Sequence, residues 1–191
     1  GSVDLVLTDP PYGMKWNTDT ARFSGGSSKS VACRGAGKSN QPRIVGDDQP
    51  FDPSLLLDFP RVILWGSNHY AARLPVGTTL VWIKRLDAAF GSFLSDAEVA
   101  WMKGGHGVYC FRDLSMTAEA KYRVHPSQKP IPTMRWCVEK AGGDGLVLDP
   151  FAGSFTTLRA CKDLGRKGIG IELEERYCEI GARRLEQGVL F

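Results

Sequence analysis

The sequence of 191 residues contains no long apolar segment. No run approaches the roughly 20 apolar residues needed to cross a bilayer, and no charged start followed by an apolar stretch marks a secretory signal. We therefore expect a cytoplasmic protein without a membrane partner. With 42% hydrophobic and 24% charged residues, the composition is typical of globular proteins, and the length fits a single domain over residues 1–191.

Cysteine and histidine are sparse, and neither residue type forms a metal-binding pattern. The cysteines include no C-x-x-C pair and the three histidines show no ligand spacing. His106 and Cys110 could form at most half of a zinc site. Because a cytoplasmic compartment keeps thiols reduced, we expect free cysteines and no metal. The cysteines are Cys33, Cys110, Cys137, Cys161 and Cys178.

A nucleotide-binding P-loop is also missing. Residues 37–39, GKS, resemble the end of the pattern G-x-x-x-x-G-K-[ST], but that pattern requires glycine at the position of Ala32. No apolar strand leads into these residues either. The sequence therefore gives no support for an NTPase.

The most unusual segment that is present spans residues 14–46. It is rich in Ser, Gly, Lys and Arg, lacks helical or strand periodicity, and carries more than the whole chain's net charge of +3. We expect a long flexible loop, either a solvated loop without function or a flap that follows the phosphates of a nucleic acid. The mild positive charge permits a nucleic-acid partner without requiring one.

Apolar patterns elsewhere in the chain predict alternating strands and helices. The expected strands span 3–7, 61–66, 79–84, 97–102, 145–148 and 168–171. The expected helices span 54–58, 131–141, 156–164 and 174–186. This alternation indicates βαβ units, and hence an α/β fold with a doubly wound, mostly parallel sheet of the Rossmann-like type.

The first strand leads into an unusual sequence, VDLVLTDPPYG, over residues 3–13. Asp9 falls where the apolar strand ends. Pro10 and Pro11 each fix their own φ angle, remove a backbone N–H and restrict the residue before them. We therefore expect a stiff, extended rim whose carbonyl groups have no competing donors, followed by the aromatic ring of Tyr12.

A second constellation lies in the stretch LVLDPFAGSFTT, which reads as a strand, a turn of small residues and the start of a helix. Ligands bind at the carboxyl edge of such sheets, where helix N-terminal amides attract negative groups. Gly153 allows close approach to the backbone, and Ser154 or Thr156 can cap the helix. Glu172 ends the next strand 23 residues after Asp149, a spacing suited to ribose hydroxyls. Each feature alone has a structural explanation, but together they predict a nucleoside-cofactor pocket.

The stretch HPSQKP at residues 125–130 precedes the first helix of this half. Lys129 could hold a carboxylate or a phosphate near the same sheet edge. It could equally be an exposed lysine in a turn framed by prolines.

Three stretches resemble signatures of S-adenosylmethionine-dependent DNA amino-methyltransferases. They are DPPY at 9–12, HPSQKP at 125–130 and DPFAGS at 149–154. The catalytic motif precedes the cofactor motif, as in the β class of that family. Together with GDDQPFD at 46–52 and WGSNHY at 65–70, the chain looks like the small phage-type DNA N6-adenine methyltransferases. The resemblance implies a class I methyltransferase fold, with S-adenosylmethionine as cofactor and DNA as partner.

The resemblance also implies site residues. The candidate catalytic residues are Asp9, Pro10, Pro11 and Tyr12. The candidate cofactor-binding residues are Asp149, Phe151, Gly153, Ser154, Thr156, Glu172, Lys129 and Pro130, with Glu172 on the ribose and Lys129 and Pro130 near the methionine part. One position departs from the family, because Phe155 stands where glycine is usual. We expect a strained backbone if φ is positive there, or a crowded cofactor if the position must be small.

These residues suggest a mechanism in which the protein positions and polarises an amine that acts as the nucleophile. The amino group of adenine is a poor nucleophile because its lone pair is delocalised into the ring. We expect Asp9 and the Pro10 carbonyl to accept its N–H groups, and Tyr12 to stack on a base flipped out of double-stranded DNA. N4-cytosine methylation is the nearest alternative, and a catalytically silent nucleic-acid-binding module is another.

Residues 103–124 are expected to be irregular and to form a short target-recognition segment. Its shortness favours relaxed or very short sequence preference, or help from a second subunit in a homodimer. Three aromatic residues, Trp82, Phe90 and Trp101, are candidates for the base pocket, although core packing is the favoured role.

Overall fold

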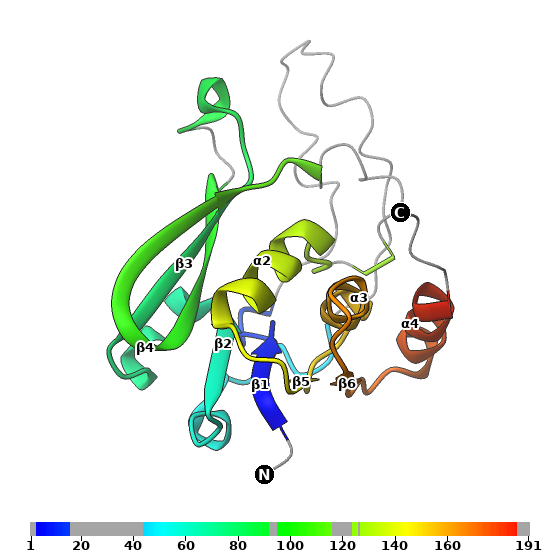
Figure 1. The fold of residues 1–191 in the computed structure, drawn as a ribbon. Coiled ribbons are helices and arrows are strands. Elements are labelled where there is room, and N and C mark those ends of the chain that lie inside the picture. Colours follow the sequence, from blue (N-terminus) through cyan, green and yellow to red (C-terminus); the bar gives the residue numbers. More distant parts are fainter. Residues whose placement is uncertain (1–2, 16–43, 92–94, 116–123, 126, 187–191) are drawn as a thin grey trace.

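The computed structural model describes residues 3–15, 44–91, 95–115, 124–125 and 127–186. Its centre is a six-stranded sheet with the strand order β3-β4-β2-β1-β5-β6 (Figure 1). The strands are β1 (Val3–Thr8), β2 (Arg61–Trp65), β3 (Gly77–Ile83), β4 (Ala97–Arg112), β5 (Leu146–Asp149) and β6 (Gly168–Gly170). The described α-helices are α2 (Ile131–Ala141), α3 (Thr156–Asp163) and α4 (Glu175–Glu186). Short 3-10 turns are η3 (Ser54–Leu56), η4 (Ser67–His69), η5 (Ala71–Arg73) and η6 (Asp87–Ala89).

The α/β fold predicted from the sequence is confirmed, and β1 lies at its centre. β1 pairs in parallel with β2 on one side and with β5 on the other, so that Val6 lies opposite both Val62 and Leu148. Leu5, Val6 and Leu7 are fully buried, because both faces of the sheet are covered at this strand. The carboxyl ends of β1 and β5 consequently lie next to each other.

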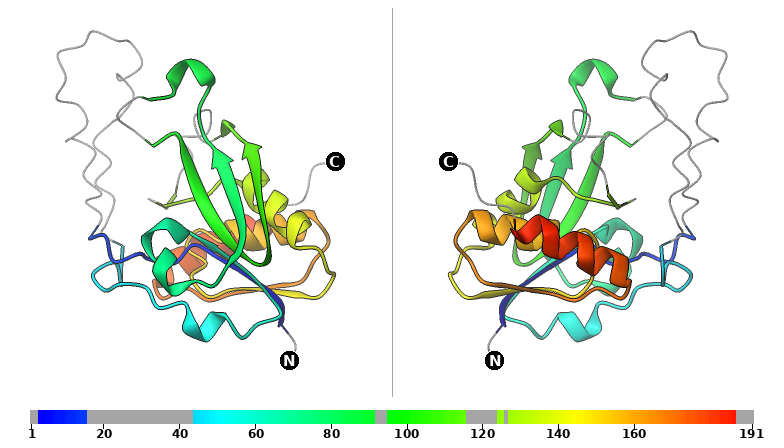
Figure 2. Two further views of the ribbon diagram at one scale, coloured as in Figure 1. Left: turned by 90° about the vertical axis from the view of Figure 1, so that its left-hand side faces the viewer. Right: turned by 90° about the vertical axis from the view of Figure 1, so that its right-hand side faces the viewer.

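Two different coverings bury the two faces of the sheet. Leu5 and Leu7 pack in one apolar cluster with residues of α2 and α3, such as Met134 and Ala160. Val6 belongs to a second cluster on the other face, together with side chains from the segment 51–74 that contains η3, η4 and η5. Figure 2 shows α2, α3 and α4 together on one side of the sheet. Within the described residues the second face is therefore covered by 3-10 turns rather than by α-helices.

The expected irregular segment at 103–124 is wrong for its first half, because β4 continues to Arg112. The chain bends at Gly104 and Gly105, whose φ angles are +82° and +66°, values that residues with a side chain rarely adopt. Both limbs of β4 then pair with β3, so that Leu80 lies opposite Ala100 in the first limb and Tyr109 in the second. The glycines that suggested a loop in fact allow the strand to turn back.

Parts of two predicted loops lie outside the described residues. They are residues 116–123 of the candidate target-recognition segment 103–124 and residues 16–43 of the basic loop 14–46. Cys33 falls in the second of them, whereas the four described cysteines are free thiols. None of the helices in the described part of the chain is long and apolar enough to cross a membrane.

From α2 onward, each helix and strand begins and ends within one residue of its predicted position. Helix α2 begins after Pro130, whose backbone is extended, and ends before Gly142, which has a φ of +66°. Its buried residues Met134, Cys137 and Val138 recur at helical spacing, so one face of the helix packs on the sheet.

Helix α4 is packed against the structure through an unusual pair, Phe155 and Gly181. Phe155 precedes α3 and has a left-handed backbone with a φ of +61°. A methyl group built on Gly181 would overlap the Phe155 ring, and one on Gly170 would lie 3.0 Å from it. The ring therefore fills space that two glycines leave open between β6 and α4.

This packing predicts that the effect of Gly181→Ala on stability depends on the Phe155 ring. In the presence of Phe155, we expect the substitution to lower the free energy of unfolding by about 1–3 kcal/mol, because the added methyl group overpacks the site. In a Phe155→Gly background the same substitution should stabilise α4 by up to about 1 kcal/mol, the ordinary gain of alanine over glycine in a helix. Urea unfolding of the four proteins measures both effects. An equal loss in the two backgrounds would contradict the packing.

Candidate active site

An open pocket with about 350 Å³ of empty volume lies at the carboxyl ends of β1 and β5. Seven of the residues predicted from the sequence line it, namely Asp9, Lys129, Asp149, Phe151, Gly153, Ser154 and Thr156. Five predicted residues are not in its lining, namely Pro10, Pro11, Tyr12, Pro130 and Glu172. The structure therefore brings the first turn of the chain and the LVLDPFAGSFTT stretch into one pocket.

Asp149 is tied into this junction by three hydrogen bonds. Its Oδ1 accepts the Thr8 hydroxyl at 2.6 Å and the Phe151 N–H at 3.2 Å, and its Oδ2 accepts the Thr157 hydroxyl at 2.5 Å. Burial raises the pKa of Asp149 to about 6, against the opposing effect of the two hydroxyl groups. Asp149 thus connects β1 to α3 as well as lining the pocket.

Glu172 holds the turn on the other side of the pocket. Its Oε2 accepts the Gly153 N–H at 2.8 Å, and its Oε1 accepts the Glu174 N–H, also at 2.8 Å. Each carboxylate oxygen still has a second lone pair, so these contacts leave room for a ligand hydroxyl. Gly153 itself has a φ of +50°, which explains glycine at this position.

The HPSQKP stretch supplies pocket residues that the sequence did not single out. His125, Ser127 and Gln128 all line the pocket. The Nδ1 atom of His125 accepts the Ser127 N–H at 3.1 Å, and its ring packs edge-on against Tyr177 with centroids 4.4 Å apart. Their position in a recognised motif was the available signal.

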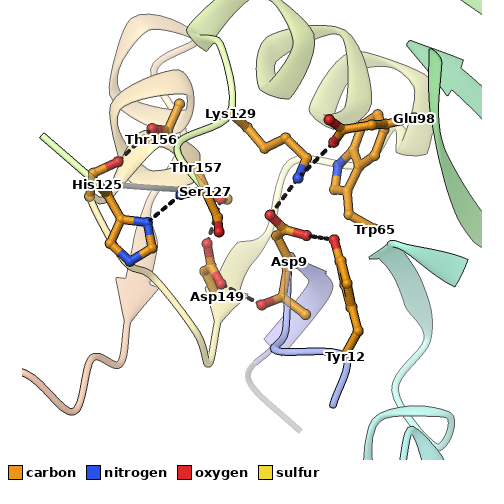
Figure 3. Close-up of polar contacts among 12 residues, drawn as sticks. Asp9, Tyr12, Trp65, Glu98, His125, Ser127, Lys129, Asp149, Thr156 and Thr157 are labelled. Atoms are coloured by element: carbon orange, nitrogen blue, oxygen red, sulfur yellow. Dashed lines mark hydrogen bonds and ion pairs between the residues drawn. The ribbon is translucent and has the colours of Figure 1, made fainter. Parts of the chain in front are cut away.

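Asp9 is surrounded by two donors, as Figure 3 shows. One carboxylate oxygen accepts the Tyr12 hydroxyl, and the other pairs with the Lys129 ammonium group. Lys129 lies 3.1 Å from Glu98 as well, and Glu98 lies 2.8 Å from Lys84. Lys129 therefore faces two carboxylates, although the family resemblance implies a place near the cofactor's methionine part.

The charges in this group stabilise one another. Burial alone would lower the pKa of Lys129, but Asp9 and Glu98 outweigh it and raise that pKa above its usual range. Burial alone would raise the pKa of Glu98, but Lys129 and Lys84 hold it at about 2. Burial, reinforced by Asp9, raises the pKa of Tyr12. Lys129 is thus a cation, Glu98 an anion and Tyr12 a neutral donor at physiological pH.

The rim after β1 is fixed by Asp47, which sequence reasoning missed. Its Oδ1 accepts the N–H groups of Tyr12, Gly13 and Met14 at 3.2, 2.9 and 3.0 Å. The Tyr12 ring stacks on His69, with centroids 4.7 Å apart and an interplanar angle of 13°. We expected the Tyr12 ring to stack on a target base, and His69 covers one face of that ring in this structure.

Phe155 stands where the family usually has glycine, and we expected either a strained backbone or a crowded cofactor. The backbone is left-handed, as expected if the position requires a positive φ. The ring, however, packs against Gly181 and is not among the residues that line the pocket. The pocket lining therefore gives no support to the expectation that Phe155 crowds a cofactor there.

Comparison with known proteins identifies the family. A family model described as DNA methylase, of the N6/N4 type, matches residues 100–183. Putative methylase YubD of Escherichia coli (strain K12) is 44% identical over 193 residues, which cover 96% of this chain and 82% of YubD. The chain therefore belongs to the N6/N4 DNA methylase family.

A shorter match concerns DNA adenine methyltransferase YhdJ of Escherichia coli (strain K12). The two sequences are 45% identical over 67 residues, which cover 35% of this chain and 23% of YhdJ. The chain thus matches about a quarter of the length of YhdJ and most of the length of YubD.

Solved structures share the fold. The M1.HpyAVI–SAM complex has a TM-score of 0.59 at 20% identity, with 97% of this chain and 90% of that chain covered. The cytosine-N4-specific PvuII DNA methyltransferase has a TM-score of 0.58 at 14% identity, with 100% and 82% covered. Both support the class I methyltransferase architecture expected from the sequence.

The buried Asp149 predicts a specific pH dependence. Its folded pKa of about 6 lies above the roughly 3.9 of aspartate in an unfolded chain, so its contribution to stability is greatest at low pH. That contribution falls as the pH rises from about 4 to about 6. The free energy of unfolding of Asp149→Asn, relative to the unmodified protein, should therefore rise over this interval and level off above it. Urea unfolding from pH 4 to pH 8 tests this, and a difference that does not vary with pH would contradict it.

Proposed function

We propose that the chain transfers a methyl group from S-adenosylmethionine to the exocyclic N6 amine of adenine in double-stranded DNA. One observation carries the proposal: Asp9, at the exit of β1, lines the same pocket as Asp149 and Gly153. An amine acceptor and a nucleoside pocket thus adjoin each other, as amine methylation requires.

The residues around the pocket suit S-adenosylmethionine. Gly153, Ser154 and Thr156 line it around the start of α3. Phe151, with 38% of its surface exposed, offers an aromatic face. Glu172 lies next to Gly153 and has lone pairs for ribose hydroxyls. The cofactor supplies a methyl group already activated by its sulfonium, so the protein's task is to position and polarise the amine.

Asp9 and Pro10 perform that task in this proposal. Asp9 and the Pro10 carbonyl accept the two amine N–H groups, which draws the nitrogen toward tetrahedral geometry and aims its lone pair at the methyl carbon. Bound S-adenosylmethionine would supply the methyl group and leave as S-adenosylhomocysteine, and the proton lost by the amine would pass to Asp9 or to solvent. Pro10, Pro11 and the contacts of Asp47 keep the acceptors in place.

The target base must leave the duplex to reach this pocket. Flipping costs a few kcal/mol, which stacking partly recovers. Tyr12 is the stacking residue in the proposal. Because His69 stacks on one face of the Tyr12 ring, the base must either displace His69 or stack beside it. The basic segment 14–46 and the residues between Arg112 and Val124 are the parts of the chain proposed to contact DNA.

The choice of adenine rests on the DPPY motif and on the name of YhdJ, an adenine methyltransferase. The same acceptors could hold the N4 amine of cytosine, and one similar structure is cytosine-N4-specific. Incubating unmethylated DNA with the protein and S-adenosylmethionine, followed by digestion and mass spectrometry of the nucleosides, separates the two. N6-methyladenine is expected, and N4-methylcytosine alone would refute the adenine assignment.

Two substitutions separate the proposed roles. Asp9→Ala should reduce methyl transfer by about 100-fold or more, because it removes an electrostatic contact to the reacting amine, while cofactor affinity changes little. Glu172→Ala should instead weaken cofactor binding, as measured by isothermal titration calorimetry. Wild-type turnover in Asp9→Ala would exclude its catalytic role. Absence of S-adenosylmethionine binding by the unmodified protein would favour a silent nucleic-acid-binding module.

A further inference from the structure

Four side chains of alternating charge lead from the pocket wall into the sheet. They follow the order Asp9, Lys129, Glu98 and Lys84. The Glu98 carboxylate lies 3.1 Å from the Lys129 ammonium group and 2.8 Å from that of Lys84. Figure 3 shows Lys129 pointing between Asp9 and Glu98. The first two residues belong to motifs of the family resemblance, whereas Glu98 lies on β4 outside them.

Lys129 is the central member of this row. Its side chain is only 8% exposed, so its charge is largely removed from water and requires compensation by nearby carboxylates. Its ammonium group has three donors and reaches both Asp9 and Glu98. The ring of Trp65 lies 5.6 Å from the ammonium nitrogen, within the range of a cation–π contact.

Among the described residues, the ion pairs of Glu98 lead to Asp9 through Lys129. Glu98 lies opposite Trp82 in the pairing of β4 with β3 and is not among the residues that line the pocket. Lys84, on the far side, holds the other oxygen of Glu98. Glu98 therefore has a fixed orientation and attracts the ammonium group away from Asp9, so that Lys129 is shared between two carboxylates instead of being drawn entirely onto one.

We propose that Glu98 is a positioning residue for methyl transfer, which through Lys129 holds the Asp9 carboxylate in the orientation that accepts the target amine. The proposal rests on the function proposed above. Without Glu98, Lys129 has Asp9 as its remaining carboxylate partner in this row, and the ion pair between them competes with the amine for the same oxygens. The substitution should therefore impair the chemical step and leave the cofactor pocket unchanged.

The first test is Glu98→Gln, which removes the charge and keeps the shape. We expect the single-turnover rate of methyl transfer to DNA to fall about tenfold or more, as small misplacements of reacting groups do. The dissociation constant for S-adenosylmethionine should stay within about twofold of the unmodified protein, because Glu98 does not line the pocket. Glu179→Gln is the matched control, since Glu179 is 62% exposed on α4, and it should retain the full rate.

The second test asks whether Glu98 acts through Lys129. In a Lys129→Met background, adding Glu98→Gln should cause no further loss of rate, because the intermediary is already absent. Lys84→Met provides a milder variant that loosens Glu98 from its outer partner, and it should lower the rate with unchanged cofactor affinity even if Lys129→Met fails to fold. Thermal unfolding of each variant identifies such a failure.

The outcomes separate the two proposals. An unmodified protein that transfers no methyl group would refute the proposed function and the positioning role with it. If the unmodified protein is active, then a normal rate in Glu98→Gln refutes the positioning role alone. So does a loss of rate that is equally large with and without Lys129, or a parallel loss of cofactor affinity.

Discussion

The parallel pairing of β1 with β5 places Asp9 and the turn after Asp149 at the same edge of the sheet, and the site depends on this contact. Thr8 and Asp149, 141 residues apart in sequence, share a buried hydrogen bond directly below the pocket. Because parallel neighbours end at the same edge, Asp9 and the turn that follows Asp149 must converge. Full burial of Leu5, Val6 and Leu7 stabilises the strand that carries this geometry.

Ion pairs hold the side chains around Asp9 in place. The Asp9 carboxylate contacts a neutral phenol on one side and a buried ammonium group on the other. Lys129 in turn is compensated by Glu98, whose outer partner is Lys84. A charge removed from water is costly unless it is paired, so the buried Lys129 requires these carboxylates. Asp47 performs the corresponding task for the rim by accepting three backbone N–H groups.

Phe155 illustrates how a departure from a family pattern can be accommodated. The left-handed backbone that glycine usually serves is retained, at a cost of about 1–2 kcal/mol for a residue with a side chain. The ring is directed away from the pocket into the space above Gly181 and Gly170. Phe155 thus affects the packing of α4, and it is not among the residues that line the pocket.

The sequence alone determined the α/β class, the strand and helix positions of the C-terminal half and the residues of the three motifs, because periodicity, turn chemistry and motif spacing are local properties. It failed at 103–112, where glycines that resemble a loop let β4 turn back onto β3. Tertiary structure alone decided the partners of Lys129, the contacts of Glu98 and the direction of the Phe155 ring. These depend on which side chains distant segments bring within a few ångströms, and local patterns do not encode such contacts.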